Sequence, residues 1–439
     1  MANGYILYPM LPKILLGIGL FATVFSVLIF SGKVSFGDKK TVASGEVYVW
    51  GTLPDEAMTQ LTQEFNPKIK TYAVRYKFVP ESNFEQTLVE AIANGQGPDA
   101  ILVPHQIILS QADRIMPFSI AEKTYRDFYV DGASVFLTSK GTLALPVSVE
   151  PMVLFYNRTL FSKHGIINPP TYWDEVVSLT PSLTVRQNGQ FLESAIALGT
   201  PSVSYAKDIL MAMVTQLGQV PVIKVANQAG EIYYSIQANE PTIDKPDVLP
   251  LVAVNRFFTQ FGDGGQSAYT WPQSQTGDPA DLFVGEKLAM YIGYSGEYQK
   301  LRDRNPRGDF QMTIFPQTRG YPTFSTGMRM YAFATLRSSK NPNASFAAES
   351  EFGGVAISPR IAAIAGGVPA FRSHAAALAL DPVLARSMLV ARGWDDRYSK
   401  QTTAYTTMMI SDIINYRYGV NEATALFIAR LRDLYTKKF

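Results

Sequence analysis

Residues 46–103 are predicted to form a strand, a helix, a strand, a helix and a third strand, and this order constrains the fold more than any other feature. Polar and apolar side chains alternate over residues 72–78, which predicts a half-buried strand. Residues 100–103 form an unbroken apolar run, which is typical of a strand buried on both faces. We therefore expect an α/β chain whose parallel sheet is covered by helices.

The carboxyl ends of these strands supply candidate ligand contacts, because open parallel sheets bind ligands at that edge. Trp50 ends the first strand, where its ring could stack on a ligand or pack on its own lobe. Glu81 follows the second strand. His105 and Gln106 follow the third strand, although His105 could also be a local capping group. We predict all four as ligand-binding residues.

Length and composition narrow the class of protein. A chain of 439 residues is too long for one ordinary hydrophobic core and suits two lobes. The net charge of +2 gives no sign of a nucleic-acid partner. The absence of cysteine excludes disulfides, thiolate metal sites, cysteine nucleophiles and a lipid anchor carried by cysteine.

A long ordered motif occupies residues 144–161: a Leu-Pro pair, the polar Glu150, an apolar run and then Tyr156-Asn157. Pro169-Pro170 follows, with a tryptophan three residues later. In this order the segments resemble type 1 extracellular solute-binding proteins, the maltose-binding-protein-like partners of sugar ABC importers, where their chain crosses between lobes. The resemblance implies a two-lobed periplasmic-binding-protein-like fold of type II. Glu150 is then a ligand contact at the hinge, or a hinge carboxylate satisfied by backbone donors.

The resemblance continues in order to the C-terminus. Residues 281–295 resemble the family's Phe-x-x-Gly-Lys-x-Ala-Met block, which runs from a helix into a strand. Residues 310–352 resemble the return crossing, and residues 367–373 resemble the last crossing. The implied lobe 1 comprises residues 46–149 and 314–366, and the implied lobe 2 comprises residues 150–313 and 367–439.

These blocks and two loops add further candidates. Tyr294 and Ser295 stand where the family commonly has a ligand-facing tryptophan, so the resemblance implies a ligand role for both. Arg372 belongs to the last crossing, where a structural ion pair is the alternative. Trp271 lies in a loop, and Trp394 precedes two aspartates and could instead seal the second lobe. We expect no catalytic residue, no metal and no cofactor, because neighbouring carboxylates in this chain suit a solvated surface better than a glycosidase pair.

The N-terminal segment has two interpretations. Residues 14–31 are almost entirely apolar and, slightly extended, long enough to cross a bilayer. A cleaved signal peptide is the alternative, but the run is long for one and the cleavage-like site at residues 41–43 is poor. We expect a single-pass anchor in the cell membrane, with residues 1–13 cytoplasmic and residues 32–45 as a tether. More lysines follow the segment than precede it, so the resemblance, and not the charge, places the binding domain outside the cytoplasm.

The resemblance implies a solute-binding protein of an ABC importer, and not an enzyme. It would capture a sugar or oligosaccharide by hinge closure between two lobes and deliver it to membrane permease subunits. The alternatives are a membrane-tethered sensor or receptor of the same fold, a binder of a peptide, polyamine or anion, and an enzyme acting on glycans. That enzyme would need two carboxyl groups facing each other across the cleft. We expect no nucleic-acid partner.

Overall fold

The computed structural model describes residues 44–226, 232–275, 277–375 and 381–436. The predicted cytoplasmic segment, residues 1–13, and the predicted anchor, residues 14–31, lie outside these ranges, as does most of the tether. Within the described ranges, no helix is long and apolar enough to cross a membrane.

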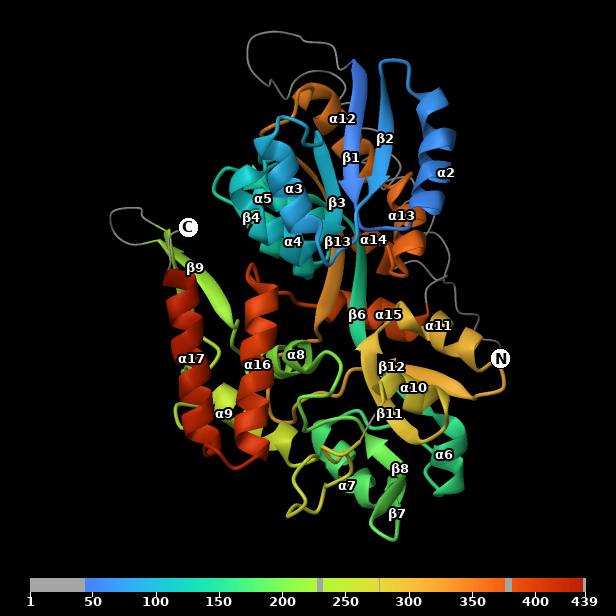
Figure 1. Ribbon diagram of the computed structural model, residues 1–439, viewed down its shortest axis with the longest axis vertical. Helices are drawn as coiled ribbons and strands as arrows, with labels where there is room; N and C mark the ends of the chain where they lie inside the picture. Colours follow the sequence, from blue (N-terminus) through green and yellow to red (C-terminus); the bar gives the residue numbers. More distant parts are fainter. Residues whose placement is uncertain (1–43, 227–231, 276, 376–380, 437–439) are drawn as a thin grey trace, which may run out of the picture. The chain divides into compact units, whose positions relative to one another are not determined.

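The described chain contains both strands and helices, and its C-terminal part is helical (Figure 1). The strands are β1 (Gly45–Gly51), β2 (Tyr72–Phe78), β3 (Ala100–Pro104), β4 (Leu137–Thr138), β5 (Gly141–Thr142), β6 (Leu145–Asn157), β7 (Val185–Gln187), β8 (Gln190–Ile196), β9 (Val222–Ala226), β10 (Ile232–Ile236), β11 (Leu288–Tyr294), β12 (Phe310–Ile314) and β13 (Met328–Thr335). The helices of the first part are α2 (Asp55–Phe65), η1 (Asn66–Lys68), α3 (Phe84–Ala93), α4 (His105–Ser110), η2 (Ala112–Arg114), α5 (Glu122–Phe128), η3 (Asp131–Phe136), α6 (Arg158–Lys163), α7 (Trp173–Leu183) and α8 (Ala206–Gln216). The remaining helices are α9 (Pro250–Thr259), α10 (Pro279–Val284), α11 (Glu297–Arg304), α12 (Pro342–Phe352), α13 (Ser358–Ala365), α14 (Arg372–Ala375), α15 (Pro382–Val390), α16 (Ser399–Ile414) and α17 (Val420–Thr436).

The predicted strand–helix alternation of residues 46–103 is confirmed. β1 pairs in parallel with β2 on one side and with β3 on the other, as expected for strands joined by helices. All five residues of β3 are buried, which explains its unbroken apolar sequence. The predicted α/β fold is therefore correct, with a mixed sheet in the order β2-β1-β3-β13-β6-β11-β8-β7 and with β12 also paired to β6.

β6 is the strand that joins the two halves of this sheet. Its 13 residues run without a break through the predicted first crossing, and 12 of them are buried. Its first part pairs with β13, and its second part pairs with β11 and β12 (Figure 1). Glu150 lies near the middle of β6, where the two halves of the sheet meet.

Two hydrophobic cores flank this point. The first core is built from β1, β3, β13 and the first part of β6, together with α3, α4 and α12. The second core is built from the rest of β6 and from β8, β11 and β12, together with α7, α8, α9, α16 and α17. Because β6 contributes to both cores, a movement between them would have to bend this strand.

Part of the segment that follows the predicted last crossing packs with the first core. Val368, Phe371 and Met388 pack in the first core, whereas the predicted boundary assigns residues 367–439 to lobe 2. The reason is local pairing, since the Val149 amide donates to the Val368 carbonyl at 2.8 Å and ties this segment to β6. The chain joins the second core again at Trp394. The lobe boundaries stay predictions.

Candidate ligand-binding cavity

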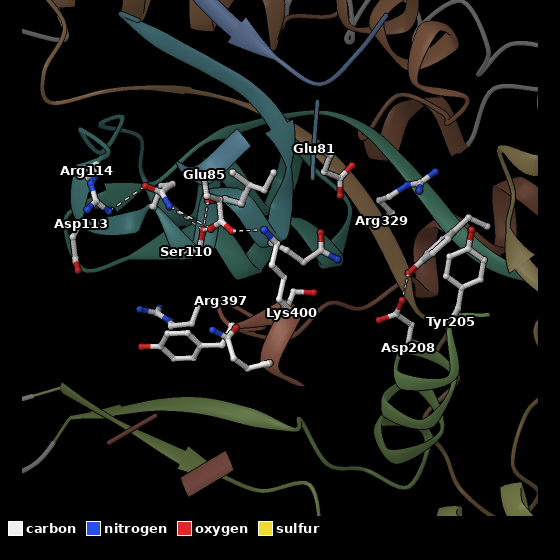
Figure 2. Close-up of a pocket in the computed structure, with 17 residues that line it drawn as sticks. Glu81, Glu85, Ser110, Asp113, Arg114, Tyr205, Asp208, Arg329, Arg397 and Lys400 are labelled. Atoms are coloured by element: carbon white, nitrogen blue, oxygen red, sulfur yellow. Dashed lines mark hydrogen bonds and ion pairs between the residues drawn. The ribbon is translucent and has the colours of Figure 1, made fainter. Parts of the chain in front are cut away.

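A cavity of about 800 Å³ lies between elements of the first core and elements of the second core, and we call it the central cavity (Figure 2). This volume is within the range of ordinary small-molecule sites, roughly 300–1,000 Å³. α3, α4, η2 and β13 form one wall, and α8, the end of β11 and the start of α16 form the other. The lining residues are Glu81, Glu85, Gln106, Ile107, Ser110, Gln111, Asp113, Arg114, Tyr205, Asp208, Tyr294, Arg329, Arg397, Tyr398, Ser399, Lys400 and Gln401.

Arg329 extends from β13 into the central cavity and is held there by Glu150 on the neighbouring strand β6. Its Nη2 lies 2.7 Å from Glu150 Oε2, and its Nε donates to Oε1 at 3.2 Å. The Glu150 side chain is 1% exposed, while that of Arg329 is 29% exposed. Burial raises the pKa of the Glu150 carboxyl above its usual value, and the guanidinium opposes that rise. Glu150 therefore affects the cavity indirectly, because it holds the Arg329 guanidinium in position.

Two tyrosines and an aspartate face Arg329 from the second core. The Arg329 guanidinium carbon lies 5.0 Å from the centre of the Tyr294 ring. The Tyr294 hydroxyl donates to Asp208 Oδ2 at 3.0 Å, and the Tyr205 ring meets the Tyr294 ring edge-on at 4.9 Å. Tyr205 precedes α8 with φ of +60°, a left-handed conformation that is uncommon for a bulky residue. With this backbone conformation, the Tyr205 side chain lies in the cavity lining.

The other end of the central cavity carries charged groups from both walls. Lys400 Nζ, at the start of α16, donates to the Ser82 carbonyl at 3.2 Å and lies 3.9 Å from Glu85 Oε2 (Figure 2). Glu85 also accepts a hydrogen bond from the Ser110 hydroxyl. Within the described ranges, the Arg114 side chain donates to the neutral side chain of Gln111, from Nη1 to Oε1 at 3.1 Å. Lys400 therefore links the second core to the first across the cavity.

Charge and ring chemistry define what the central cavity can hold. Four acidic and four basic side chains line it, together with three tyrosines and several amides and hydroxyls. The basic side chains donate hydrogen bonds and the acidic side chains accept them. This mixture suits a ligand with many hydroxyl groups, each of which can donate and accept. Flat ring faces suit the apolar faces of such a ligand.

Three of the predicted ligand contacts line the central cavity: Glu81, Gln106 and Tyr294. Glu150 is fully buried and reaches the cavity only through its ion pair with Arg329. Ser295 follows Tyr294, is 8% exposed and lies outside the cavity lining, so its ligand role stays a prediction.

The predicted tryptophans lie elsewhere. Trp50 packs in the first core, with Lys77 Nζ 4.2 Å from its ring centre. Trp271 has no exposed surface and belongs to the second core. His105 and Trp394 line an adjoining space of about 20 Å³, room for about one water molecule, which shares Gln106 and Asp208 with the central cavity. His105 Nδ1 accepts from the Met330 amide at 3.3 Å, and burial lowers its pKa to about 3, so the ring is a neutral structural group.

Arg372 is also outside the central cavity. Its Nε donates to the Arg126 carbonyl at 2.8 Å, and its guanidinium forms an ion pair with Asp131, which also pairs with Arg392. The structural ion pair that the sequence left as the alternative is therefore what the structure contains.

Several lining residues were missed by sequence reasoning, among them Tyr205, Asp208, Arg329 and Lys400. For two of them a signal existed. Arg329 is the only charged residue in the strand Met328–Thr335, and Asp208 lies in the largely apolar helix α8. A charge within an apolar element is costly to bury unless it is paired or faces a cavity.

Comparisons with known proteins match this architecture. The profile of the family described as bacterial extracellular solute-binding protein matches residues 50–350. The multiple sugar-binding protein of Streptococcus mutans serotype c is 22% identical over 269 residues, which cover 60% of this chain and 59% of that protein. The chain thus spans less than two thirds of the length of this curated relative.

Solved structures of similar proteins share the fold. A cyclo/maltodextrin-binding protein in complex with maltotetraose is 15% identical, with a TM-score of 0.71 over 91% of this chain and 100% of that chain. The cyclic alpha-maltosyl-1,6-maltose binding protein of Arthrobacter globiformis is 16% identical, with a TM-score of 0.70 over 89% of this chain and 98% of that chain. A Thermotoga lettingae ABC transporter solute-binding protein bound with alpha-D-tagatose is 16% identical, with a TM-score of 0.64 over 89% of this chain and 100% of that chain.

Proposed function

Because the chain belongs to the bacterial extracellular solute-binding protein family, we propose that it captures a sugar or oligosaccharide in the central cavity for an ABC importer. The observation that carries the proposal is the cavity wall. Tyr205 and Tyr294 present rings beside the Asp208 carboxylate and the Arg329 guanidinium, with an equal number of acidic and basic groups overall. This balance favours a neutral polyhydroxylated solute over an anion or a polyamine, either of which would leave one set of charges unpaired.

The proposed mechanism is hinge closure between the two cores, followed by docking on permease subunits. Two contacts support it, since Arg329 meets the Tyr294 ring and Lys400 meets Ser82, and each joins a residue of one wall to a residue of the other. A ligand that touches both walls would stabilise the closed arrangement by its greater affinity for it. We also propose that residues 14–31 anchor the protein in the cell membrane, with the binding domain outside the cytoplasm.

The deciding experiment is isothermal titration calorimetry of residues 44–439 against mono- and oligosaccharides, a peptide, a polyamine and inorganic phosphate. We expect binding of a saccharide that weakens at least tenfold in Asp208→Asn. The matched control is Asp303→Asn, which changes an exposed aspartate of α11 outside the central cavity. Binding of a peptide, polyamine or phosphate with no saccharide binding would refute the sugar assignment.

A further inference from the structure

A second cavity, of about 610 Å³, lies against the second core and shares no lining residue with the central cavity. We call it the lateral cavity. It is formed by α9, the loop after α9 and the connection between α16 and α17 (Figure 1). Its lining residues are Ala253, Arg256, Phe257, Thr259, Gln260, Asp263, Gln266, Ile413, Ile414, Tyr416, Tyr418, Gly419 and Val420. Its volume also suits a small-molecule site.

Tyr416 is an exposed ring that is fixed in place at this cavity. The residue is 75% exposed, yet its hydroxyl donates to Asp263 Oδ1 at 2.6 Å. Its backbone has φ of +54° at the end of α16, where the amides of Tyr416 and Arg417 return to the carbonyls of Ile413 and Asp412 at 3.0 and 2.9 Å. Glycine normally occupies this left-handed position after a helix. Tyrosine in this conformation strains the backbone, which points to a use for the ring.

The lateral cavity repeats the chemistry of the central cavity. Four residues other than glycine have a positive φ in the described part of the chain, and two of them are the cavity tyrosines Tyr205 and Tyr416. Each cavity has a tyrosine hydroxyl bound to an aspartate, Tyr294 to Asp208 and Tyr416 to Asp263. Each also has a second tyrosine and an arginine in its lining.

We propose that the lateral cavity is a second saccharide-binding site that holds a sugar unit of a longer chain against Tyr416. The choice of a saccharide as the ligand class rests on the function proposed for the central cavity. The Tyr416 ring offers a flat apolar face to the C–H face of a sugar. Arg256 and Gln266 are exposed donors beside it, and Arg256 has no carboxylate partner among the described residues. Asp263 can accept further hydrogen bonds from sugar hydroxyls.

Affinity electrophoresis of residues 44–439 in native gels that contain amylopectin, xylan or galactomannan tests the proposal. We expect at least one polysaccharide to retard the wild type and the Tyr205→Gly/Asp208→Asn variant equally. Tyr416→Gly should lose this retardation while folding at least as well, because glycine adopts a positive φ freely. Arg256→Ala should weaken it, and Tyr233→Ala, which removes another exposed tyrosine, should not.

Calorimetry with a short oligosaccharide separates this proposal from the function proposed for the central cavity. Loss of binding in Tyr205→Gly/Asp208→Asn but not in Tyr416→Gly supports the central site alone. Unchanged retardation of Tyr416→Gly, or no retardation of the wild type in any of the three gels, overturns the lateral site whatever the central cavity binds.

Discussion

Arg329 on β13 and Glu150 on β6 form a two-point ion pair at the junction of the two cores, with Nη2–Oε2 and Nε–Oε1 distances of 2.7 and 3.2 Å. The pair joins residues 179 positions apart in the sequence. Because the Glu150 side chain is 1% exposed, it depends on Arg329 for its counter-charge, whereas Arg329 keeps access to the cavity. The pair thus links the strand that crosses between the cores to the central cavity.

Arg329→Ala is expected to lower the free energy of unfolding by roughly 3–5 kcal/mol, because it leaves a buried carboxylate without a partner. The loss should be smaller at pH 5 than at pH 8. Without Arg329 the pKa of Glu150 rises further, so the carboxyl is neutral at low pH. At high pH the folded variant must either keep a buried, unpaired carboxylate or hold a proton that the unfolded chain releases, and both lower its stability. Urea denaturation at both pH values measures this. Arg319→Ala, which breaks an exposed pair with Asp174, should cost about 1 kcal/mol or less, and equal losses in the two variants would contradict the argument.

Tyr205→Gly is expected to weaken saccharide binding at least tenfold, about 1.4 kcal/mol, with little loss of stability. The ring is lost from the cavity wall, while the positive φ at this position suits glycine better than tyrosine. Calorimetry with the best saccharide of the panel measures the affinity. Tyr48→Ala is the matched control, because Tyr48 is half exposed on β1 and outside both cavities. An unchanged affinity in Tyr205→Gly would remove Tyr205 from the binding site.

The sequence predicted the local structure better than the site. The alternation of strands and helices over residues 46–103 follows from the spacing of apolar residues close together in the sequence. The strands β1, β2 and β3 and the helices between them could therefore be predicted from the sequence alone. The central cavity could not, because its residues come from segments that only the folded chain brings together. The motif singled out Glu150 but not its partner Arg329, which lies on another strand.

Residue type alone did not indicate how deeply each aromatic ring is buried. Tryptophan suits both a binding surface and a core, and a sequence does not distinguish these uses. Trp271 is completely buried, and Trp50, Trp394 and Tyr294 are nearly so, whereas the partly buried Tyr205 and the exposed Tyr416 offer more ring surface to the two cavities. The left-handed backbone at Tyr205 and Tyr416 has no sequence signature, because a glycine would be expected there.

Glu349→Gln is expected to stabilise the protein at high pH. The Glu349 carboxyl is fully buried on α12, where Oε2 accepts from the Thr335 hydroxyl at 2.7 Å, and burial raises its pKa to about 8. Between the unfolded pKa near 4.5 and the folded value, the folded state binds a proton that the unfolded state does not, so stability falls as pH rises. The free energy of unfolding falls by up to about 1.4 kcal/mol per pH unit in that window.

Urea denaturation of the wild type and Glu349→Gln at pH 5.5 and 7.5 should show a stability advantage for Glu349→Gln that grows with pH. A constant difference would mean that Glu349 is ionised in the folded protein at both values.

Gly296→Ala is expected to strain the junction between the two cores. Gly296 has φ of −65°, so alanine is not disfavoured by the backbone, and any effect reports on space. A Cβ there would lie 2.4 Å from the Gly366 carbonyl oxygen and 2.7 Å from Glu150 Oε2. The first of these atoms belongs to the backbone and cannot rotate away, so we expect a loss of about 1–3 kcal/mol in the free energy of unfolding.

The Gly296→Ala variant should also bind saccharide more weakly although it leaves the cavity lining unchanged, because a separated junction opposes closure. Gly419→Ala, where a Cβ meets nothing within 4 Å, is the control for stability. Small-angle scattering with and without saccharide measures closure, and a Gly296→Ala protein that compacts as the wild type does would show that this junction does not govern the movement.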